Sequence, residues 1–287
     1  MPEMPEVEAL RGFLADRCIG EAFDQIQLVA FSALKTYSPP LDSLLGLEIT
    51  SVTRHGKYLD LEAQGLHLVF HLARAGWLVW RDEVPDKPLR PGRGPMALRV
   101  KLSSGAGFDL TEAGTKKHLA IHVVNNPHEI DMIATLGPDP TDPGFTADDF
   151  DWVLSQAKRS QIKGVLKDQR TLAGIGNAYS DEILHVAKLS PFHPASSLTR
   201  DERDALLATI RQVLAEAVSA TYGLGAESLK DSKRAGMRVH GRTGEPCPVC
   251  GTPVAEVSFA DSSLQYCPEC QTGGKPLADR RMSRLLK

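Results

Sequence analysis

The 287-residue sequence contains no long uninterrupted apolar run. No stretch approaches the roughly 18 residues that a membrane-spanning helix requires. The first six residues, Met-Pro-Glu-Met-Pro-Glu, also lack the apolar segment of a secretory signal. The sequence therefore predicts a cytoplasmic protein with no membrane partner. A hydrophobic content of 42% is enough for a sizeable core, and the length allows two or three domains.

The sequence also lacks the net positive charge that is typical of nucleic-acid-binding proteins, since its formal charge is −3. The charge is unevenly distributed, however. Residues 230–287 contain ten Lys or Arg against six Asp or Glu, and a second basic stretch contains only one acid, Asp168. That stretch comprises Lys158, Arg159, Lys163, Lys167 and Arg170. Local basic patches suit phosphate contacts, although charge alone would describe a solvated surface equally well.

Cysteine is scarce, with five residues in the chain. Cys18 is predicted to be a small buried apolar residue. The other four form two C-x2-C pairs separated by sixteen residues, namely Cys247, Cys250, Cys267 and Cys270. This spacing is typical of a tetrahedral zinc site, and four protein ligands leave no open position, so we expect one structural Zn²⁺. Two disulfides are the alternative, and a reducing compartment disfavours them. The spacing does not indicate what the finger contacts.

Hydrophobic periodicity separates two regions. Residues 5–18 read as a helix with a proline in its first turn and acids at its positive end. Residues 23–123 then read as short strands separated by turns, which is typical of a sandwich or barrel. The individual strands are expected at 48–54, 58–62, 67–71, 76–81, 97–102 and 107–110, with a proline-rich loop at 85–95.

Helical patterns follow a turn-rich linker at residues 136–140. The expected helices are 146–157, with Thr146 as N-cap, then 177–187 and the long amphipathic 199–220. We therefore predict an N-terminal domain at 1–130, a helical domain at 131–230, a zinc finger at 231–271 and a basic tail at 272–287.

Pro2 is the most reactive candidate at the N-terminus. If Met1 is removed, Pro2 presents a secondary amine with a pKa of about 7.7–8.0, so that a useful fraction is unprotonated at neutral pH. Such an amine can attack a sugar C1′ and form an iminium. Glu3 is adjacent and can handle protons. This pattern alone is weak, because any exposed N-terminus would look the same.

The whole chain resembles the formamidopyrimidine-DNA glycosylase/endonuclease VIII family. Six motifs match in order: PEMPEVE at 2–8, HGKYL at 55–59, HL at 71–72, LGPDP at 136–140, LAGIGNAY at 172–179 and VHGR at 239–242. The resemblance implies an N-terminal helix plus β-sandwich, a helical helix–two-turn–helix domain and a C-terminal zinc-finger β-hairpin.

The resemblance also implies an activity, that of a bifunctional DNA glycosylase and AP lyase in base excision repair. Pro2 would attack C1′ of the damaged nucleotide, and Glu3 would be the general acid and base. Lys57 would hold phosphate and assist proton transfer, although by itself it would read as a surface lysine. The iminium acidifies the C2′ proton, so that elimination cuts the strand after the base leaves.

Further residues would contact the partner, double-stranded DNA with a damaged base or abasic site, bound by a monomer. The resemblance implies Asn177, Lys163, Arg74, His71, Lys116, Lys117 and Arg242 for this role. Asn177 lies after two glycines at a helix start, where backbone amides suit an anion. The residue type alone would make Asn177 an N-cap.

Several positions depart from the family pattern. Arg74 stands where the family inserts a Met into the DNA, and residues 111–118 lack its Phe. Ser262 replaces a phosphate-gripping Arg, and the loop at 223–237 is shorter than the one that caps 8-oxoguanine. The tail adds Lys275, Arg280, Arg281, Arg284 and Lys287. These departures leave the lesion open. They also leave open two rivals, a non-catalytic DNA binder with the same fold and a zinc-ribbon protein-interaction module.

Overall fold

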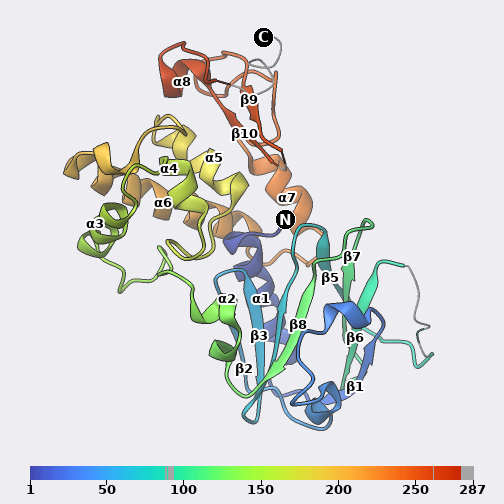
Figure 1. Ribbon diagram of the computed structural model, residues 1–287. Coiled ribbons are helices and arrows are strands. Elements are labelled where there is room, and N and C mark those ends of the chain that lie inside the picture. Colours follow the sequence, from blue (N-terminus) through green and yellow to red (C-terminus); the bar gives the residue numbers. More distant parts are fainter. Residues whose placement is uncertain (88, 90–93, 261, 279–287) are drawn as a thin grey trace. The chain divides into compact units, whose positions relative to one another are not determined.

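The computed structural model describes residues 1–87, 89, 94–260 and 262–278, and the chain forms two compact units (Figure 1). The first unit contains Met1–Leu136 and a returning segment, Thr221–Lys230. The second contains Gly137–Ala220 and the chain from Asp231 onward. Most of the predicted basic tail, 279–287, lies outside the described residues.

Helix α1 (Met4–Cys18) opens the first unit and confirms the helix predicted at 5–18. Its start is fixed by a capping box, in which the Glu3 backbone N–H donates to Glu6 Oε2 at 2.8 Å and the Glu3 carboxylate accepts from the Glu6 backbone. Val7, Leu10 and Leu14 are buried along one face. Cys18 is fully buried at the end of the helix, as predicted.

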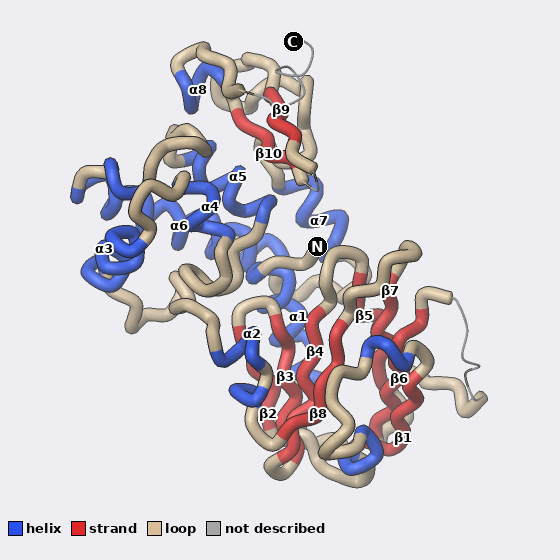
Figure 2. The backbone as a smooth tube through the Cα atoms, viewed as in Figure 1, coloured by secondary structure: helices blue, strands red, loops and turns tan. Residues whose placement is uncertain are grey.

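Two four-stranded antiparallel sheets follow, and they confirm the predicted sandwich (Figure 2). One sheet has the order β1-β6-β7-β5, and the other has the order β2-β3-β4-β8. The strands are β1 (Phe23–Leu28), β2 (Ser51–His55), β3 (Tyr58–Ala63), β4 (Leu66–His71), β5 (Gly76–Arg81), β6 (Met96–Leu102), β7 (Gly107–Glu112) and β8 (Ala120–Val124). Short helical turns η1 (Phe31–Ala33), η2 (Leu41–Leu44) and η3 (Pro127–Glu129) and helix α2 (Asp131–Ala134) lie between or after them.

One apolar core joins the two sheets and α1. Phe70 on β4 and Phe108 on β7 are fully buried, with ring centroids 6.1 Å apart. The returning segment Thr221–Lys230 adds fully buried Ala226 and Leu229 to the same core. Trp77 Nε1 donates to the Ala226 carbonyl at 2.9 Å. Residues 221–230 are therefore anchored to the sandwich rather than hanging free of it.

Helices dominate the second unit, as predicted. They are α3 (Ala147–Gln156), α4 (Ile162–Lys167), α5 (Asn177–Val186), the short η4 (Ala195–Ser197) and α6 (Arg200–Thr221). Thr146 caps α3 in a reciprocal box with Asp149, which confirms that prediction. The expectation of a plain loop at 223–237 is wrong, because α7 (Leu229–Gly236) occupies it. Only Leu229 of this short charged helix is buried, so no apolar periodicity marked it.

The chain ends in a small β-hairpin followed by one helical turn, β9 (Ala255–Ser258), β10 (Ser263–Tyr266) and α8 (Pro268–Thr272). Its apolar residues form two small clusters, one around Val239 and Val254 and one around Val257, Leu264 and Tyr266. Such limited burial is little to hold a fold together without a metal. Within the described part of the chain, no helix has the length and apolar character needed to cross a membrane.

Candidate active site and nucleic-acid interface

The first candidate residues lie at the buried start of α1. Pro2 is buried, Glu3 is 2% exposed and Glu6 is fully buried. The capping box fixes both carboxylates, because each accepts a hydrogen bond from the backbone of the other residue. The positive end of a helix also favours negative charge at these positions. The structure thus holds a carboxylate rigidly beside the second residue of the chain.

Lys57 lies in the tight turn Gly56–Lys57 between β2 and β3. Gly56 adopts φ 57°, a left-handed conformation that glycine adopts without strain. Lys57 is only 7% exposed, so the alternative of an ordinary surface lysine is wrong. Lysine is rarely buried unless it is paired or functional.

Arg54 joins the helix to this turn. Its Nε donates to Glu8 Oε2 on α1 at 2.9 Å, and its Nη1 donates to the Gly56 carbonyl at 2.9 Å. Arg11 holds the other oxygen of Glu8 at 2.7 Å. Burial alone would raise the pKa of Glu8, but hydrogen bonds from Arg54 and Arg11 outweigh it and lower the pKa. Sequence reasoning missed this link, because no spacing relates residues 8, 54 and 56.

His71 ends β4 opposite Tyr58, the residue after Lys57, and the two rings lie 4.7 Å apart. Burial, followed by the nearby Lys57 ammonium, lowers the pKa of His71 to about 4. The imidazole is therefore neutral at pH 7. Its Nδ1 accepts from the Ala73 backbone N–H at 3.2 Å, which leaves the ring proton on Nε2. His71 is thus a neutral hydrogen-bond donor.

Arg74 is exposed in the turn between β4 and β5. The turn is closed by a hydrogen bond from the Gly76 N–H to the Leu72 carbonyl at 2.8 Å. A Cβ at Gly76 would lie 2.0 Å from that carbonyl oxygen, so only glycine fits. Ala73 takes a left-handed φ of 52°. This tight turn projects Arg74 into solvent, which is compatible with insertion into a ligand.

Lys116 and Lys117 lie on the exposed loop between β7 and β8. The buried Glu112 carboxylate anchors the loop by accepting from the His118 N–H at 2.8 Å and the Leu119 N–H at 3.0 Å. The Lys117 ammonium donates to the Glu112 carbonyl. The loop is therefore held at its base while both lysines stay at the surface.

In the second unit, Lys163 lies in the interior, although the sequence suggested a phosphate contact. It is 5% exposed, and its Nζ lies 2.7 Å from Asp181 Oδ1 and 2.7 Å from Ser180 Oγ. The same ammonium donates to the Asn177 carbonyl at 3.1 Å. The DNA contact that the resemblance implies for Lys163 stays a prediction, and in the structure the ammonium faces Asp181 inside the protein. Its partners make it a residue that positions the start of α5.

Asn177 is the first residue of α5, and the N-cap is Gly176. The alternative that Asn177 is the cap is therefore wrong. Its Nδ2 donates to the Ser263 carbonyl of β10 at 2.8 Å. Asn177 thus ties the helix–two-turn–helix to the terminal hairpin, and it lies at the helix end where backbone N–H groups favour anions.

Glu182, 2% exposed on α5, anchors the segment that leads into the zinc finger. Its carboxylate accepts from the backbone N–H groups of Arg238 at 2.7 Å and of Val239 and His240 at 2.9 Å. The second oxygen of Asp181 holds His240 Nδ1 at 2.7 Å. Two consecutive buried acids on one helix therefore fix residues 238–240.

Arg242 follows this segment and is partly buried. It forms an ion pair with Glu245 at 3.0 Å and donates to the Ala235 carbonyl at 3.3 Å. Its Nε is buried with no hydrogen-bond partner among the described residues. The side chain as a whole is 35% exposed, so its exposed part, rather than the buried Nε, can donate to a phosphate.

The four predicted metal ligands converge. The Sγ atoms of the group Cys247, Cys250, Cys267 and Cys270 all lie within 4.8 Å of one another. Two of these separations are 3.4 Å and 4.0 Å. A tetrahedral zinc site with Zn–S bonds of about 2.3 Å places its sulfurs about 3.8 Å apart, so the thiols fit the ion. His185 Nε2 lies 3.2 Å from Cys247 Sγ and supports that ligand from α5.

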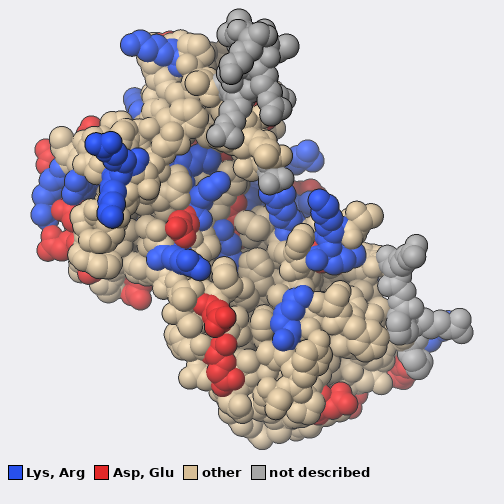
Figure 3. Space-filling view, in the orientation of Figure 1, with Lys and Arg blue, Asp and Glu red and all other residues tan. Residues whose placement is uncertain are grey.

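At the hairpin, the Phe259 N–H donates to the Ser262 carbonyl at 2.8 Å, and the weaker phosphate contact expected at Ser262 stays a prediction. In Figure 3, the viewed face carries separate groups of Lys and Arg atoms with Asp and Glu between them. On this face, basic residues thus form local groups, in line with the formal net charge of −3.

Comparisons with known proteins match the three regions just described. Residues 1–120 match the family model of the formamidopyrimidine-DNA glycosylase N-terminal domain. Residues 136–228 match the corresponding H2TH domain, and residues 244–273 match the zinc finger found in FPG and IleRS. The four clustered cysteines are therefore a structural zinc site.

Comparison with individual proteins agrees with these family-model matches. A formamidopyrimidine-DNA glycosylase of Desulfitobacterium hafniense is 32% identical, covering 94% of this chain and 100% of the relative. An uncharacterized formamidopyrimidine-DNA glycosylase-like protein of Mycobacterium tuberculosis is 58% identical, covering 53% of this chain and 94% of its own length. The chain belongs to the formamidopyrimidine-DNA glycosylase family.

Solved structures extend the likeness to the fold. The Thermus thermophilus MutM (Fpg) protein is 30% identical with a TM-score of 0.78, covering 96% of this chain and all of that one. The Lactococcus lactis enzyme, solved with DNA containing an abasic site, is 25% identical with a TM-score of 0.80, covering 94% and 99%. That relative thus shares the helix, the sandwich, the helix–two-turn–helix and the zinc finger.

Proposed function

We propose that the chain is a bifunctional DNA glycosylase and AP lyase whose nucleophile is the amine of Pro2 after removal of Met1. The observation that carries this proposal is the arrangement at the start of α1. Buried Pro2 and the buried N-cap Glu3 directly precede helix α1, and Arg54 links that helix to the turn in which Lys57 is buried. Family membership supports the same roles.

The Pro2 nitrogen forms a bond to C1′, the C1′–base bond breaks, and the base leaves with a proton. The amine then loses its proton, and Glu3 delivers a proton to O4′ as the sugar ring opens. These two steps give a C1′ iminium. The iminium acidifies C2′–H, so removal of that proton expels the 3′ phosphate and cuts the strand. Lys57 holds phosphate and assists these transfers.

The partner in this proposal is double-stranded DNA with a damaged base or an abasic site. His71 offers a neutral N–H to a phosphate, and Arg74, Lys116 and Lys117 project from loops of the same unit. The second unit offers Asn177 and the partly exposed Arg242. Relatives solved with abasic DNA support this partner.

Borohydride trapping on abasic DNA tests the proposal. Protein with a confirmed N-terminal Pro2 should become covalently fixed to the DNA, because borohydride reduces the iminium. Pro2→Gly leaves a primary amine and should retain weak trapping, whereas one extra residue before Pro2 should abolish it. Glu3→Gln should bind DNA but turn over poorly.

A non-catalytic DNA binder is the second candidate, and one observation favours it. Ser262 stands where the family grips phosphate with an arginine, and Arg74 is the sole described charge on its turn that can fill a vacated base position. If protein with Pro2 exposed binds abasic DNA but gives no adduct, this candidate is the better account. An adduct that requires Pro2 excludes it.

A further inference from the structure

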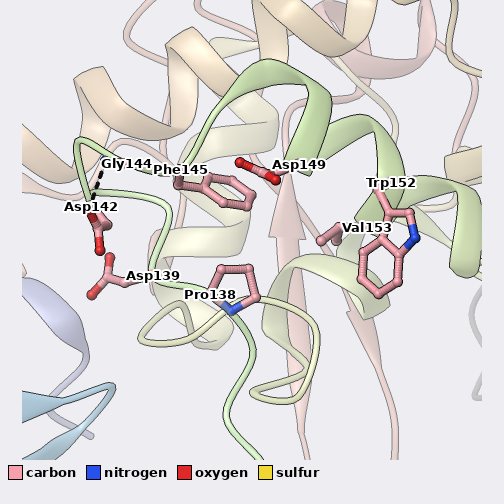
Figure 4. Close-up of a pocket in the computed structure, with 8 residues that line it drawn as sticks. All are labelled: Pro138, Asp139, Asp142, Gly144, Phe145, Asp149, Trp152 and Val153. Carbon is pink, nitrogen blue, oxygen red and sulfur yellow. Dashed lines mark hydrogen bonds between the residues drawn. The ribbon is translucent and has the colours of Figure 1, made fainter.

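A hollow of about 360 Å³ lies on the second unit, on the linker and helix α3 (Figure 4). Its floor is apolar, since Phe145 is 6% and Val153 is 5% exposed. Trp152 is 65% exposed, and its indole lies beside this floor with Pro138 on the other side. A large aromatic ring left in solvent next to an apolar depression is a feature of contact surfaces rather than of a monomer core.

Acidic side chains line the hollow. Asp142 and Asp149 are among its lining residues, and those residues include no Lys or Arg. Asp142 Oδ1 accepts from the Gly144 N–H at 2.8 Å, and Asp149 Oδ2 accepts from the Thr146 N–H at 2.8 Å. These bonds orient the carboxylates without neutralising them. Hydrogen bonds from Thr146 also lower the pKa of Asp149, so it is ionised at neutral pH.

Two arginines close to the hollow, Arg211 and Arg200, bond to other groups. Arg211 donates from Nε to the Pro140 carbonyl at 3.0 Å and from Nη2 to the Phe145 carbonyl. It therefore stabilises the backbone of the segment that contains Phe145. Arg200 pairs with Asp148 at 2.8 Å and with Asp151 at 3.4 Å. The hollow therefore presents the carboxylates of Asp142 and Asp149, with no cation among its described lining residues. A phosphate backbone would be repelled from it, so it lies outside the proposed DNA-binding role.

We propose that this hollow docks an arginine-bearing segment of a partner protein, with the guanidinium stacked on Trp152 and facing the carboxylates. Guanidinium groups stack on indole faces and pair with carboxylates through two parallel N–H bonds. The volume admits one side chain of a short linear segment rather than a folded surface. Charge complementarity selects a basic occupant over an apolar or acidic one.

The test uses the full chain and a fluorescein-labelled Gly-Arg-Gly-Arg-Gly peptide, followed by anisotropy at about 0.15 M salt. We expect saturable binding that Trp152→Ala and Asp149→Asn each weaken by about tenfold or more. Trp152→Phe should retain most of the affinity, because it keeps a stacking face. The matched control Asp201→Asn, an exposed acid on α6 outside the hollow, should bind like the wild type. A peptide with citrulline in place of arginine should not bind.

Three results would overturn the proposal. One is no saturable binding up to about 1 mM peptide. Another is equal binding by wild type and Trp152→Ala, which would mark a diffuse charge effect. The third is binding that appears only after residues 275–287 are deleted, because the chain's own basic tail would then be the occupant. Thermal unfolding of each variant verifies that the fold is intact, as expected for the exposed Trp152.

Discussion

The N-terminal region and the zinc-finger region position their candidate residues by different means. In the first, α1 and the β2–β3 turn rest on a large apolar core, and the Arg54–Glu8 pair that joins them is partly exposed. In the second, the apolar clusters are small, and fully buried charged residues connect α5 to the zinc-finger segment. Asp181 is 0% exposed and holds Lys163 and His240 at once.

The difference follows from the amount of apolar surface available. A sandwich of eight strands can tolerate a few polar groups at its edge, because its core already fixes the backbone. A hairpin with two short strands cannot, so it depends on a metal and on buried hydrogen bonds to α5. Disturbing the polar links should therefore cost little in the first region and much in the second.

Removal of zinc should have the largest effect. Structural zinc contributes about 10–16 kcal/mol in small domains, so chelation should unfold the hairpin while the sandwich persists. Hydrogen exchange should rise throughout residues 255–271 and stay unchanged at residues 59–71. Protein purified without zinc, or a hairpin that stays protected after chelation, would contradict this.

Asp181→Asn should come next. It leaves the buried Lys163 ammonium without its counter-charge, which costs about 3–5 kcal/mol. The matched control Asp148→Asn breaks the exposed pair with Arg200 and should cost less than about 1 kcal/mol. Denaturant unfolding measures both. Adding Lys163→Met to Asp181→Asn should recover part of the loss, and equal costs for the two single variants would refute the comparison.

His71 makes the first region sensitive to acid. Its folded pKa of about 4 lies below the unfolded value of about 6.5, so protonation favours the unfolded state. Stability should therefore fall as pH drops below about 6.5 and level off below about 4. Between pH 7 and pH 5 the wild type should lose about 2 kcal/mol more than His71→Gln, measured by urea unfolding. Identical pH profiles for the two proteins would show that His71 does not carry this effect.

Substitution of Arg54 should have the smallest effect on the free energy of unfolding but a measurable effect on the rate of trapping. Arg54→Met removes the bond to the Gly56 carbonyl, so Lys57 loses its alignment with α1. We expect trapping on abasic DNA to slow about tenfold with little change in DNA affinity. Arg11→Met removes the other Glu8 partner without touching the turn and should trap at the wild-type rate. If trapping slows equally in both variants, the hydrogen bond from Arg54 to the Gly56 carbonyl does not explain the loss of rate.

The sequence predicted local features well. Helix α1 carries its own capping box, the β-strands have recognisable apolar periodicity, and the cysteine spacing specifies its geometry. These signals reside within a few consecutive residues. The same holds for the Thr146 cap of α3.

Long-range polar contacts were not predictable. Lys163, Asp181 and Glu182 look like solvated charges on short helices, but their partners lie up to 59 residues away. Arg54 meets Glu8 across 46 residues. A single sequence shows neither the pairing nor the burial, so the same reasoning placed Lys163 at the surface and missed Arg54.

Peptide mapping of the borohydride adduct tests the central claim most directly. Protein with a confirmed N-terminal Pro2 is trapped on abasic DNA, both macromolecules are digested, and the modified peptide is sequenced by mass spectrometry. The account predicts that the reduced sugar is attached to the nitrogen of Pro2 in the N-terminal peptide. Attachment to Lys57 or to any other lysine, with Pro2 unmodified, would contradict it.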